Sequence, residues 1–384
     1  MKPVRCDKPI YVTRPTMPSF EAYTALIEQL WETRWLSNDG VLYRDLEERV
    51  ADYLGVEHLS LFCNGTLALL LALQMLRISG GEVITTPFTF PATPHVLHWN
   101  GITPVFCDIE ADRANIDPAR IEELITPATR AILGVHVYGH PCDIDAIETI
   151  ANRHGLLVIY DAAHTFGSRF RNRAMASFGD AAILSFHATK LFTTAEGGAL
   201  VMRTKAQRER VRSLKNFGIA GEESVIGPGI NAKMSEFQAA FGLLQLEQID
   251  REIAQRARVD AVYRTMLRDL PGVTLFSLPP ETTPNHAYFP ILVDGDLCGV
   301  SRDGLYNALK EYNIFTRKYF FPLCSHYPCY AGLASASPAR LPVAERISRQ
   351  VLCLPIYGTL EVATARQIAS TIMYIVNAGQ GDTG

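Results

Sequence analysis

The sequence has 384 residues, of which 48% are apolar and 20% charged, enough apolar material for a large core and a second, smaller domain. The formal net charge of −4 leaves no basic excess to neutralise a nucleic-acid backbone, so we expect no nucleic-acid partner. Prolines and charges break up the N-terminal apolar stretches, and no later apolar run has the length of a bilayer span, which predicts a cytoplasmic protein without membrane contact.

The eight cysteines are scattered and form no CxxC pair, a pattern typical of reduced thiols in a cytoplasmic protein. Cys324, His326 and Cys329 form the one Cys/His cluster in the sequence. No second pair with zinc-site spacing accompanies them, so we expect no metal site.

The first half of the chain predicts helices and then an alternation of strands and helices. Between about residues 20 and 55, two stretches with apolar residues at helical spacing flank the turn-rich LSNDG. Further helices are expected at 66–76 and 142–155, between short apolar runs that read as buried strands. The alternation predicts an α/β fold with a mostly parallel, doubly wound sheet. The expected strands are 82–87, 103–109, 131–139, 156–163, 181–186 and 198–203.

The second half of the chain predicts a smaller α+β domain. Residues 234–267 are periodic and contain one glycine and no proline, which predicts one or two helices leading out of the sheet domain. Beyond them come Pro-rich turns, a strand at 288–294 and an amphipathic helix at 301–313. We therefore expect a large domain over residues 1–250 and a small C-terminal domain over residues 251–384.

A carboxylate and an amine are expected over one cleft of the sheet. Asp161 ends the apolar run LLVIY, and Lys190 follows the next apolar run, AAILSF, so both are expected at neighbouring strand ends, where such sheets bind ligands. A pyridoxal phosphate enzyme needs this pair: the amine forms a Schiff base, and the carboxylate keeps the pyridine nitrogen protonated. Taken singly, Asp161 also suits a helix N-cap and Lys190 an exposed surface charge.

The stretch CNGTLALLLALQML (63–76) is a candidate phosphate cradle. A Gly-Thr step opens an apolar helix, and backbone N–H groups, the helix dipole and a hydroxyl together bind phosphate, although an ordinary N-cap has the same letters. Asn64-Gly65-Thr66 also fits the glycosylation pattern, which requires secretion. GPGINA (227–232) formally fits a dinucleotide motif, but it follows no strand and carries a proline, so no nicotinamide cofactor is expected.

An aromatic residue in TPFTFPAT (86–93), either Phe88 or Phe90, is expected to stack on a flat cofactor ring, although a core position suits each of them as well. The stretch follows a predicted strand.

Taken together, these motifs resemble the DegT/DnrJ/EryC1/StrS sugar aminotransferases, a branch of the fold-type I pyridoxal phosphate enzymes. The resemblance covers nearly the whole chain and keeps the family's order of motifs. It runs through FCNGTLAL, EVITTPFTFPAT, VHVYGHPCDID, YDAAHTFGS, SFHATK with EGGAL, GINAKMSEFQAAFGLLQL and VLCLPIY.

The resemblance implies a role for each matching residue. Lys190 would be the lysine that binds pyridoxal 5′-phosphate and moves the proton, and Asp161 would pair with the pyridine nitrogen. Asn231 would reach the cofactor phosphate of the neighbouring subunit, so the resemblance implies a homodimer with shared active sites. The remaining cofactor residues would be Gly65, Thr66 and Ser185 at the phosphate and Phe90 on the ring.

Two histidines extend this candidate site. His164 stands where many family members have a glutamine that binds the cofactor's 3-oxygen; an imidazole can make the same contact, but the location of its proton stays open. His187, three residues before Lys190, suits a substrate-facing role and packing about equally.

A closer resemblance is to the branch that aminates C4 of a dTDP-linked 4-keto-6-deoxyhexose for O-antigen, lipopolysaccharide or antibiotic sugars, with L-glutamate as donor. Within TRKYFFPLCSHYP (316–328), Arg317 and Lys318 would face the diphosphate, and Tyr319 the sugar or base; a solvated pair of cations is the alternative.

Other activities within the family stay open. They are amination at C3 and a non-catalytic regulatory protein that binds the cofactor. The 3-dehydratases of the family carry histidine in place of the lysine, so Lys190 argues against that reaction.

Overall fold

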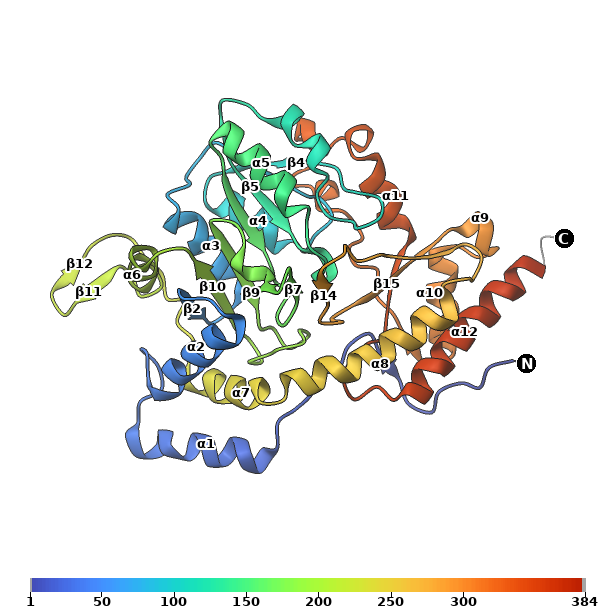
Figure 1. Cartoon of the computed structure of the whole chain (residues 1–384), viewed down its shortest axis with the longest axis horizontal. Coiled ribbons are helices and arrows are strands. Elements are labelled where there is room, and N and C mark those ends of the chain that lie inside the picture. The colour runs from blue at the N-terminus through green and yellow to red at the C-terminus, as the bar shows by residue number, and fades with distance from the viewer. Residues whose placement is uncertain (1, 382–384) are drawn as a thin grey trace.

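The computed structural model describes residues 2–381 and is built around a seven-stranded sheet (Figure 1). All its strands run parallel except β10, which lies antiparallel to both of its neighbours. This confirms the predicted fold class. In spatial order the strands are β2 (Leu59–Phe62), β10 (Gly198–Met202), β9 (Ala181–Ser185), β6 (Leu157–Asp161), β5 (Thr129–Val135), β3 (Glu82–Thr85) and β4 (Thr103–Phe106).

Sequence reasoning missed one strand of this sheet and extended several others too far. Strand β2 was not predicted, because its four residues carry too short an apolar run to stand out. The run 131–139 was predicted as one strand, but β5 ends at Val135, and Tyr138 lies in a tight turn with a φ of 59°. The apolar residues beyond Val135 are buried by contacts other than strand pairing.

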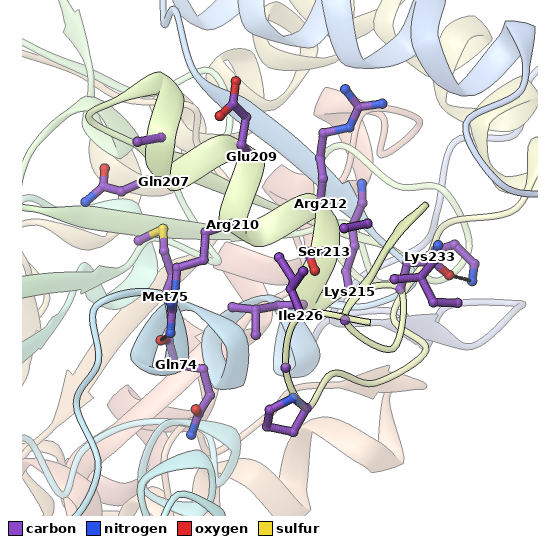
Figure 2. Close-up of a pocket in the computed structure, with 18 of the residues that line it drawn as sticks. Gln74, Met75, Gln207, Glu209, Arg210, Arg212, Ser213, Lys215, Ile226 and Lys233 are labelled. Atoms are coloured by element: carbon purple, nitrogen blue, oxygen red, sulfur yellow. Dashed lines mark hydrogen bonds between the residues drawn. The ribbon is translucent and has the colours of Figure 1, made fainter. Parts of the chain in front are cut away.

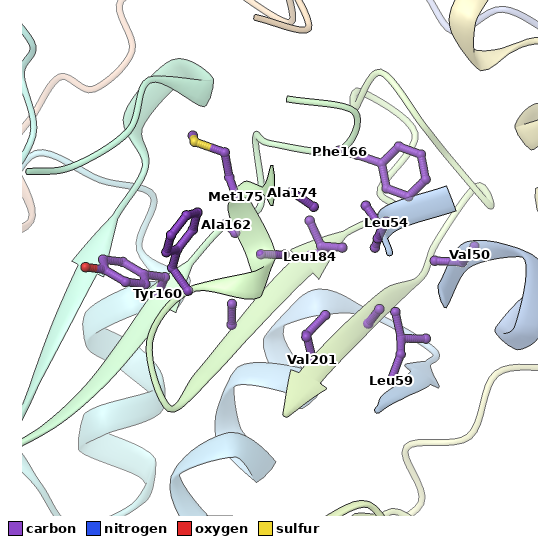
Figure 3. Packing of buried hydrophobic residues seen from close by; sticks show 14 of the residues in the cluster. Val50, Leu54, Leu59, Tyr160, Ala162, Phe166, Ala174, Met175, Leu184 and Val201 are labelled. Carbon is purple, nitrogen blue, oxygen red and sulfur yellow. The ribbon is translucent and has the colours of Figure 1, made fainter. Parts of the chain in front are cut away.

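Helices cover both faces of the sheet, because its strands are apolar on both sides. Neighbouring residues on one strand point to opposite faces: Ile183 packs with helices α3 and α4, whereas Leu184 packs with α2, α5 and α7. Figure 3 shows the second of these faces, where Leu184 and Val201 meet Val50 and Leu54. These helices are α2 (Val41–Leu54), α3 (Gly65–Met75), α4 (Ala92–Trp99), α5 (Ile144–His154) and α7 (Glu236–Leu246).

Two further helices lie toward the edge of the large sheet. Helix α1 (Phe20–Thr33) packs mainly against α7 and lies outside the body, and α6 (Lys205–Leu214) packs on α3 (Figure 1). A hairpin of β11 (Ile219–Gly221) and β12 (Ser224–Val225) projects beyond α6.

The chain then leaves the large sheet along α7 and α8 (Ile249–Leu267), the two helices allowed for residues 234–267. Beyond α8 a small antiparallel sheet forms in the order β13 (Val273–Leu275), β15 (Phe289–Val293), β17 (Val351–Leu354). A separate apolar core surrounds this sheet. The helices of this part are α9 (Gly295–Cys298), α10 (Arg302–Glu311), α11 (Pro342–Gln350) and α12 (Val362–Gly381).

The N-terminal residues pack on this C-terminal part. Strand β1 (Ile10–Tyr11) pairs in parallel with β16 (Ile314–Phe315), and Cys6 and Ile10 belong to the apolar core around α8 and α12. Another small sheet joins β14 (Thr282–Thr283), β7 (Arg169–Phe170) and β8 (Arg173–Ala174). We keep a division near residue 250 as a proposal.

Between residues 2 and 381, no helix combines the length and the apolar character needed to cross a bilayer. In the same part of the chain, no three His, Cys, Asp or Glu side chains are grouped to hold a metal ion. In the cluster noted in the sequence, the Cys324 thiol donates to the Thr89 carbonyl at 3.3 Å, and the His326 imidazole meets the Glu345 carboxylate at 2.5 Å.

A buried ion pair joins α8 to both ends of the chain. Glu252 accepts hydrogen bonds from Arg256 Nε at 2.8 Å, from the Gly358 backbone N–H at 2.8 Å and from the Thr16 hydroxyl at 2.7 Å. Both charged side chains are almost fully buried, with exposures of 6% for Glu252 and 2% for Arg256. Removing one partner therefore leaves an uncompensated charge inside the protein.

We predict that Glu252→Ala lowers the free energy of unfolding by about 3–5 kcal/mol, because Arg256 stays buried without its partner. Asp45→Ala is the matched control, since Asp45 and Arg49 form a pair with the same spacing on the surface, and its cost should stay below about 1 kcal/mol. Urea unfolding at pH 7 measures both; equal losses in the two variants would contradict the prediction.

Candidate active site

A cavity of about 250 Å³ lies at the carboxyl ends of β6 and β9, against the N-terminus of α3. This is where a doubly wound sheet binds its ligands. Strands β6 and β9 are parallel neighbours, with Asp161 opposite Ile183, so the chain segments that carry Asp161 and Lys190 do meet. The wall includes Gly65, Thr66, Phe90, Asp161, His164, Ser185, His187, Lys190, Glu196, Tyr288, Tyr319 and Phe320.

Lys190 projects into this cavity from the loop that follows β9. Its backbone N–H bonds to the His187 carbonyl at 2.8 Å, and its Nζ lies 3.2 Å from the Tyr288 hydroxyl. Burial lowers the pKa of Lys190 to about 8, although the Asp161 carboxylate acts in the opposite direction. A large fraction of the amine is therefore neutral near pH 8, as a nucleophile or base requires. This setting does not match an exposed surface charge.

Asp161 is buried at the end of β6 and begins no helix, so the N-cap alternative does not apply. Its two oxygens accept hydrogen bonds from the Thr93 hydroxyl at 2.8 Å and from the Ala163 backbone N–H at 3.1 Å. Burial raises the pKa of Asp161, and these two donors, together with Lys190, partly offset that rise. A cation placed beside this carboxylate would favour its ionised form.

The first turn of α3 forms an anion-binding concavity. The Asn64 side chain accepts from the Leu67 backbone N–H at 2.8 Å, while the N–H groups of Gly65 and Thr66 have no acceptor within the helix. The start of α3 lies very close to the end of β9 and the start of β10. A Cβ on Gly198 would lie 2.7 Å from Gly65 Cα, and one on Gly65 would lie 3.1 Å from Ser185 Cβ. Gly198 is needed for this approach and Gly65 makes it easier, and together they bring the Ser185 side chain beside the helix N-terminus.

The structure decides which nitrogen of His164 carries the proton. Nδ1 accepts a hydrogen bond from the Tyr138 backbone N–H at 3.1 Å, so the neutral ring carries its proton on Nε2. Burial, followed by the nearby Lys190, lowers the pKa of His164 well below its usual range. The ring also lies parallel to that of Phe320, with centroids 6.0 Å apart. His164 is therefore a neutral hydrogen-bond donor on the cavity wall.

The two phenylalanines of the 86–93 stretch have different surroundings. Phe88 is fully buried and packs edge-on against Tyr138 and Phe320. Phe90 is 60% exposed and lines the cavity. The structure thus places Phe90, and not Phe88, where it can cover a flat ligand.

Three of the residues selected from the sequence lie outside this cavity wall. The Lys318 ammonium is paired with Asp303 at 2.5 Å and lies over the Tyr306 ring, and Arg317 is an exposed residue whose backbone pairs with Cys353. Asn231 is exposed at the foot of the β11–β12 hairpin, where it forms a bridge with Asn216. Lys318 thus lies beside the cavity, next to Tyr319 of its wall, and is paired with Asp303.

His187 and Tyr319 do line the cavity. His187 Nδ1 lies 2.8 Å from the Thr189 hydroxyl, and its Nε2 lies 3.6 Å from the Glu196 carboxylate.

Sequence reasoning missed Tyr288 and Thr93. Tyr288 opens a predicted strand of the C-terminal part, and Thr93 lies in the first turn of α4, far from both Lys190 and Asp161 along the chain. No local pattern marks either residue, since their importance comes only from contacts between distant segments.

A second and larger cleft, of about 1020 Å³, lies between α6, the end of α3 and the β11–β12 hairpin (Figure 2). Arg210, Arg212, Lys215 and Lys233 contribute cations to its wall, and Glu209 and Asp39 contribute carboxylates. The GPGINA stretch forms part of this rim and follows a hairpin, not a strand that leads into a helix. The groups with acid–base and nucleophilic character are gathered in the smaller cavity.

The chain is similar in sequence and in structure to known sugar aminotransferases. The sequence model of the DegT/DnrJ/EryC1/StrS aminotransferase family matches residues 20–373. A dTDP-4-amino-4,6-dideoxy-D-glucose transaminase from Escherichia coli is 47% identical over 96% of the chain and 99% of its own length. One from Shigella dysenteriae is 45% identical over 96% of the chain and 100% of its length. The crystal structure of DesI with its TDP-sugar product superimposes with a TM-score of 0.93 at 38% identity, covering 99% of this chain and 96% of DesI.

Proposed function

The chain belongs to the DegT/DnrJ/EryC1/StrS aminotransferase family, and from this premise we propose that it transfers the amino group of L-glutamate to C4 of a dTDP-linked 4-keto-6-deoxyhexose. The product would be a dTDP-linked 4-amino-4,6-dideoxy sugar for O-antigen, lipopolysaccharide or a related glycan. The named relatives with 45% and 47% identity over almost their full length support this substrate class.

The cofactor of this aminotransferase is pyridoxal 5′-phosphate, and the residues of the smaller cavity suit it. The Gly65–Gly198 approach, which a Cβ would obstruct, leaves the α3 N-terminus and the Ser185 hydroxyl open to a phosphate. We assign the phosphate to Gly65, Thr66 and Ser185, the pyridine nitrogen to Asp161, and the ring face to Phe90. His164 would donate its Nε2 proton to the ring's 3-oxygen.

When bound, the cofactor supplies an aldehyde that takes up amines and a ring that accepts electrons. The chain itself supplies the base: burial lowers the pKa of Lys190 to about 8, so a large fraction of Nζ is neutral near that pH and would take the proton from the α-carbon of glutamate. The same atom would return a proton to C4 of the sugar. Asp161 would keep the pyridine nitrogen protonated, and the neutral His164 would leave the charge balance of the cavity unchanged.

Substrate recognition is assigned to the open side of the cavity, where His187 and Tyr319 lie. Arg317 remains a proposed contact for the diphosphate, because it is exposed and lies two residues before Tyr319 of the cavity wall. Lys318 also remains a proposed contact for the diphosphate, since the exposed Asp303 carboxylate is shared between Lys318 and Arg302.

The observation that carries the proposal is the placement of Lys190 and Asp161 in one cavity beside an anion-binding helix N-terminus. The test is an assay of the purified protein with L-glutamate and, in separate reactions, dTDP-4-keto-6-deoxyglucose and its 3-keto isomer, followed by NMR of the products. A 4-amino sugar is the expected product. A 3-amino sugar from a 3-keto substrate, or cofactor binding without turnover, would replace the proposal with one of the alternatives named from the sequence.

We also propose a cytoplasmic homodimer with shared active sites. Exposed apolar side chains lie on α1, with Phe20 at 76% and Trp31 at 68%, and at the end of the hairpin, with Val225 at 69% and the following Ile226 at 68%. Large exposed patches of this kind mark interaction surfaces. Asn231 is exposed at the foot of this hairpin, which leaves its side chain free to contact a partner subunit in the proposed dimer. The cysteines are all free, which suits a reducing compartment.

A shared site predicts that two inactive variants complement each other. Lys190→Ala and Asn231→Glu should each be defective, but a mixed dimer has one site with both native residues, so refolding the two together should restore partial turnover. Mixing Lys190→Ala with Asp161→Asn is the control, since both residues come from one chain and no intact site can form. Failure of the first mixture to exceed the second would contradict a shared site.

A further inference from the structure

The hydroxyl of Tyr288 is placed directly against the amine of Lys190. The two polar atoms are 3.2 Å apart, and Nζ lies 5.8 Å from the centre of the phenol ring. Tyr288 immediately precedes β15 of the C-terminal sheet, whereas Lys190 follows β9 of the large sheet. The contact therefore brings the two parts of the chain together at the reacting atom.

We propose that Tyr288 is a positioning residue for Lys190, which it holds over the cavity by a hydrogen bond in both protonation states of the amine. The phenol oxygen accepts from the ammonium when Lys190 is protonated, and the phenol O–H donates to the amine lone pair when Lys190 is neutral. This inference rests on the proposed function, since it deepens the role of Lys190 as the base.

The phenol is held in place from several sides. Its ring lies 4.7 Å from His164, 5.8 Å from Tyr138 and 6.1 Å from Tyr319, measured between centroids. The Tyr288 ring is thus packed against three other rings, which limits its motion.

The backbone just before Tyr288 is also anchored. Asn285 donates through Nδ2 to the carbonyls of His164 and Phe166, both at 2.8 Å, and the Ala287 carbonyl accepts from Arg256 at 3.3 Å. The phenol is therefore fixed relative to the loop that follows Asp161, the other charged group at the site.

The hydroxyl acts without ionising. Burial raises the pKa of Tyr288, and the Asp161 carboxylate adds to the rise while Arg256 opposes it, so the phenol stays protonated over the working pH range. A neutral phenol can both donate and accept, which a base that gains and loses a proton needs from its partner. The other titratable groups that face Lys190 in the cavity are Asp161, His164, His187, Glu196 and Tyr319.

The first test measures Lys190 in the full-length chain freed of cofactor, by its rate of reductive methylation at a series of pH values followed by mass spectrometry. Tyr288→Phe should lower the apparent pKa of Lys190, because the charge-assisted bond to the ammonium is lost while the burial stays. Tyr319→Phe is the matched control. Tyr319 lines the same cavity, but in the part of the chain that the structure describes its hydroxyl makes no hydrogen bond to Lys190 Nζ. It should leave this pKa unchanged.

The second test measures turnover of the cofactor-loaded enzyme. Tyr288→Phe should reduce kcat about tenfold, the value of one well-placed hydrogen bond, and leave KM for the sugar nearly unchanged. The acidic limb of the pH–rate profile should shift to lower pH with the pKa of Lys190. A change in KM alone would assign Tyr288 to the substrate and overturn the proposal.

A second substitution guards against loss of fold in Tyr288→Phe. 3-Fluorotyrosine at position 288 keeps the ring and the hydroxyl but weakens the oxygen as an acceptor, so the pKa of Lys190 should fall by an intermediate amount. An unchanged pKa in both variants would overturn the inference. If the protein fails to transaminate any keto sugar but the methylation shift is present, the proposed function fails while the positioning of Lys190 by Tyr288 stands.

Discussion

Lys190→Ala should lower turnover at least about 10³-fold, because it removes the residue that we propose both to bind the cofactor and to move the proton. No neighbouring group replaces it: the Tyr288 phenol stays protonated, and the His164 ring uses Nδ1 to accept from the Tyr138 backbone. The measurement is the rate of 2-oxoglutarate release from L-glutamate in the presence of the keto sugar.

Lys205→Ala is the matched control, since Lys205 is an exposed lysine at the start of α6 and should leave turnover unchanged. Circular dichroism and a thermal melt establish that both variants fold. Undiminished activity of Lys190→Ala would remove the central residue of the site and, with it, the proposed mechanism.

Lys190→Ala should lower turnover but should not lower the stability of the cofactor-free protein. The folded-state pKa of Lys190 is about 8, below its ordinary 10.5, so between these pH values the unfolded chain binds more protons and stability rises with pH. Below pH 8 the folded protein holds a buried ammonium at a cost. Lys190→Ala removes this cost, so the cofactor-free variant should melt at a temperature no lower than the native chain at pH 7.

Asp161→Asn should lower turnover about 10²–10³-fold while keeping the size and shape of the side chain. The reason is electrostatic. Removing one partner of a buried ion pair costs about 3–5 kcal/mol, because the other charge, here that of the proposed protonated ring nitrogen, is left uncompensated. The amide cannot hold that nitrogen protonated, although it can still accept hydrogen bonds from Thr93 and the Ala163 backbone. Steady-state kinetics with both substrates measure the loss.

Thr93→Val provides the comparison for Asp161→Asn, since it removes one hydrogen bond to the carboxylate but keeps the charge. Its effect on turnover should be much smaller, at about tenfold or less. Equal losses in the two variants would mean that the orientation of Asp161, and not its charge, is what matters.

Asp161→Asn, like Lys190→Ala, should lower turnover without lowering the stability of the cofactor-free protein. Burial raises the folded-state pKa of Asp161 above its ordinary 3.8, so the stability it contributes is present at acid pH and falls as pH rises through the raised pKa. At pH 7, the cofactor-free Asp161→Asn protein should therefore be at least as stable as the native chain in urea unfolding.

Much of the fold and part of the site could be predicted from local patterns. Continuous apolar runs identify strands buried on both faces, and their alternation with helices predicts a parallel sheet without any knowledge of contacts. Asp161 and Lys190 each follow such a run, so parallel topology alone brings them to one edge. The family motifs around them are likewise contiguous stretches of sequence.

The tertiary structure decided what depends on segments that meet across the fold. It buried Phe88 and left Phe90, the residue implied by the family resemblance, at the cavity wall. It also placed the His164 proton on Nε2 through the Tyr138 backbone and paired Lys318 with Asp303. It also brought Tyr288 from the C-terminal sheet to Lys190. Periodicity reports which face of an element is buried but not which distant side chain lies opposite, so these partners are set only once the two parts of the chain pack together.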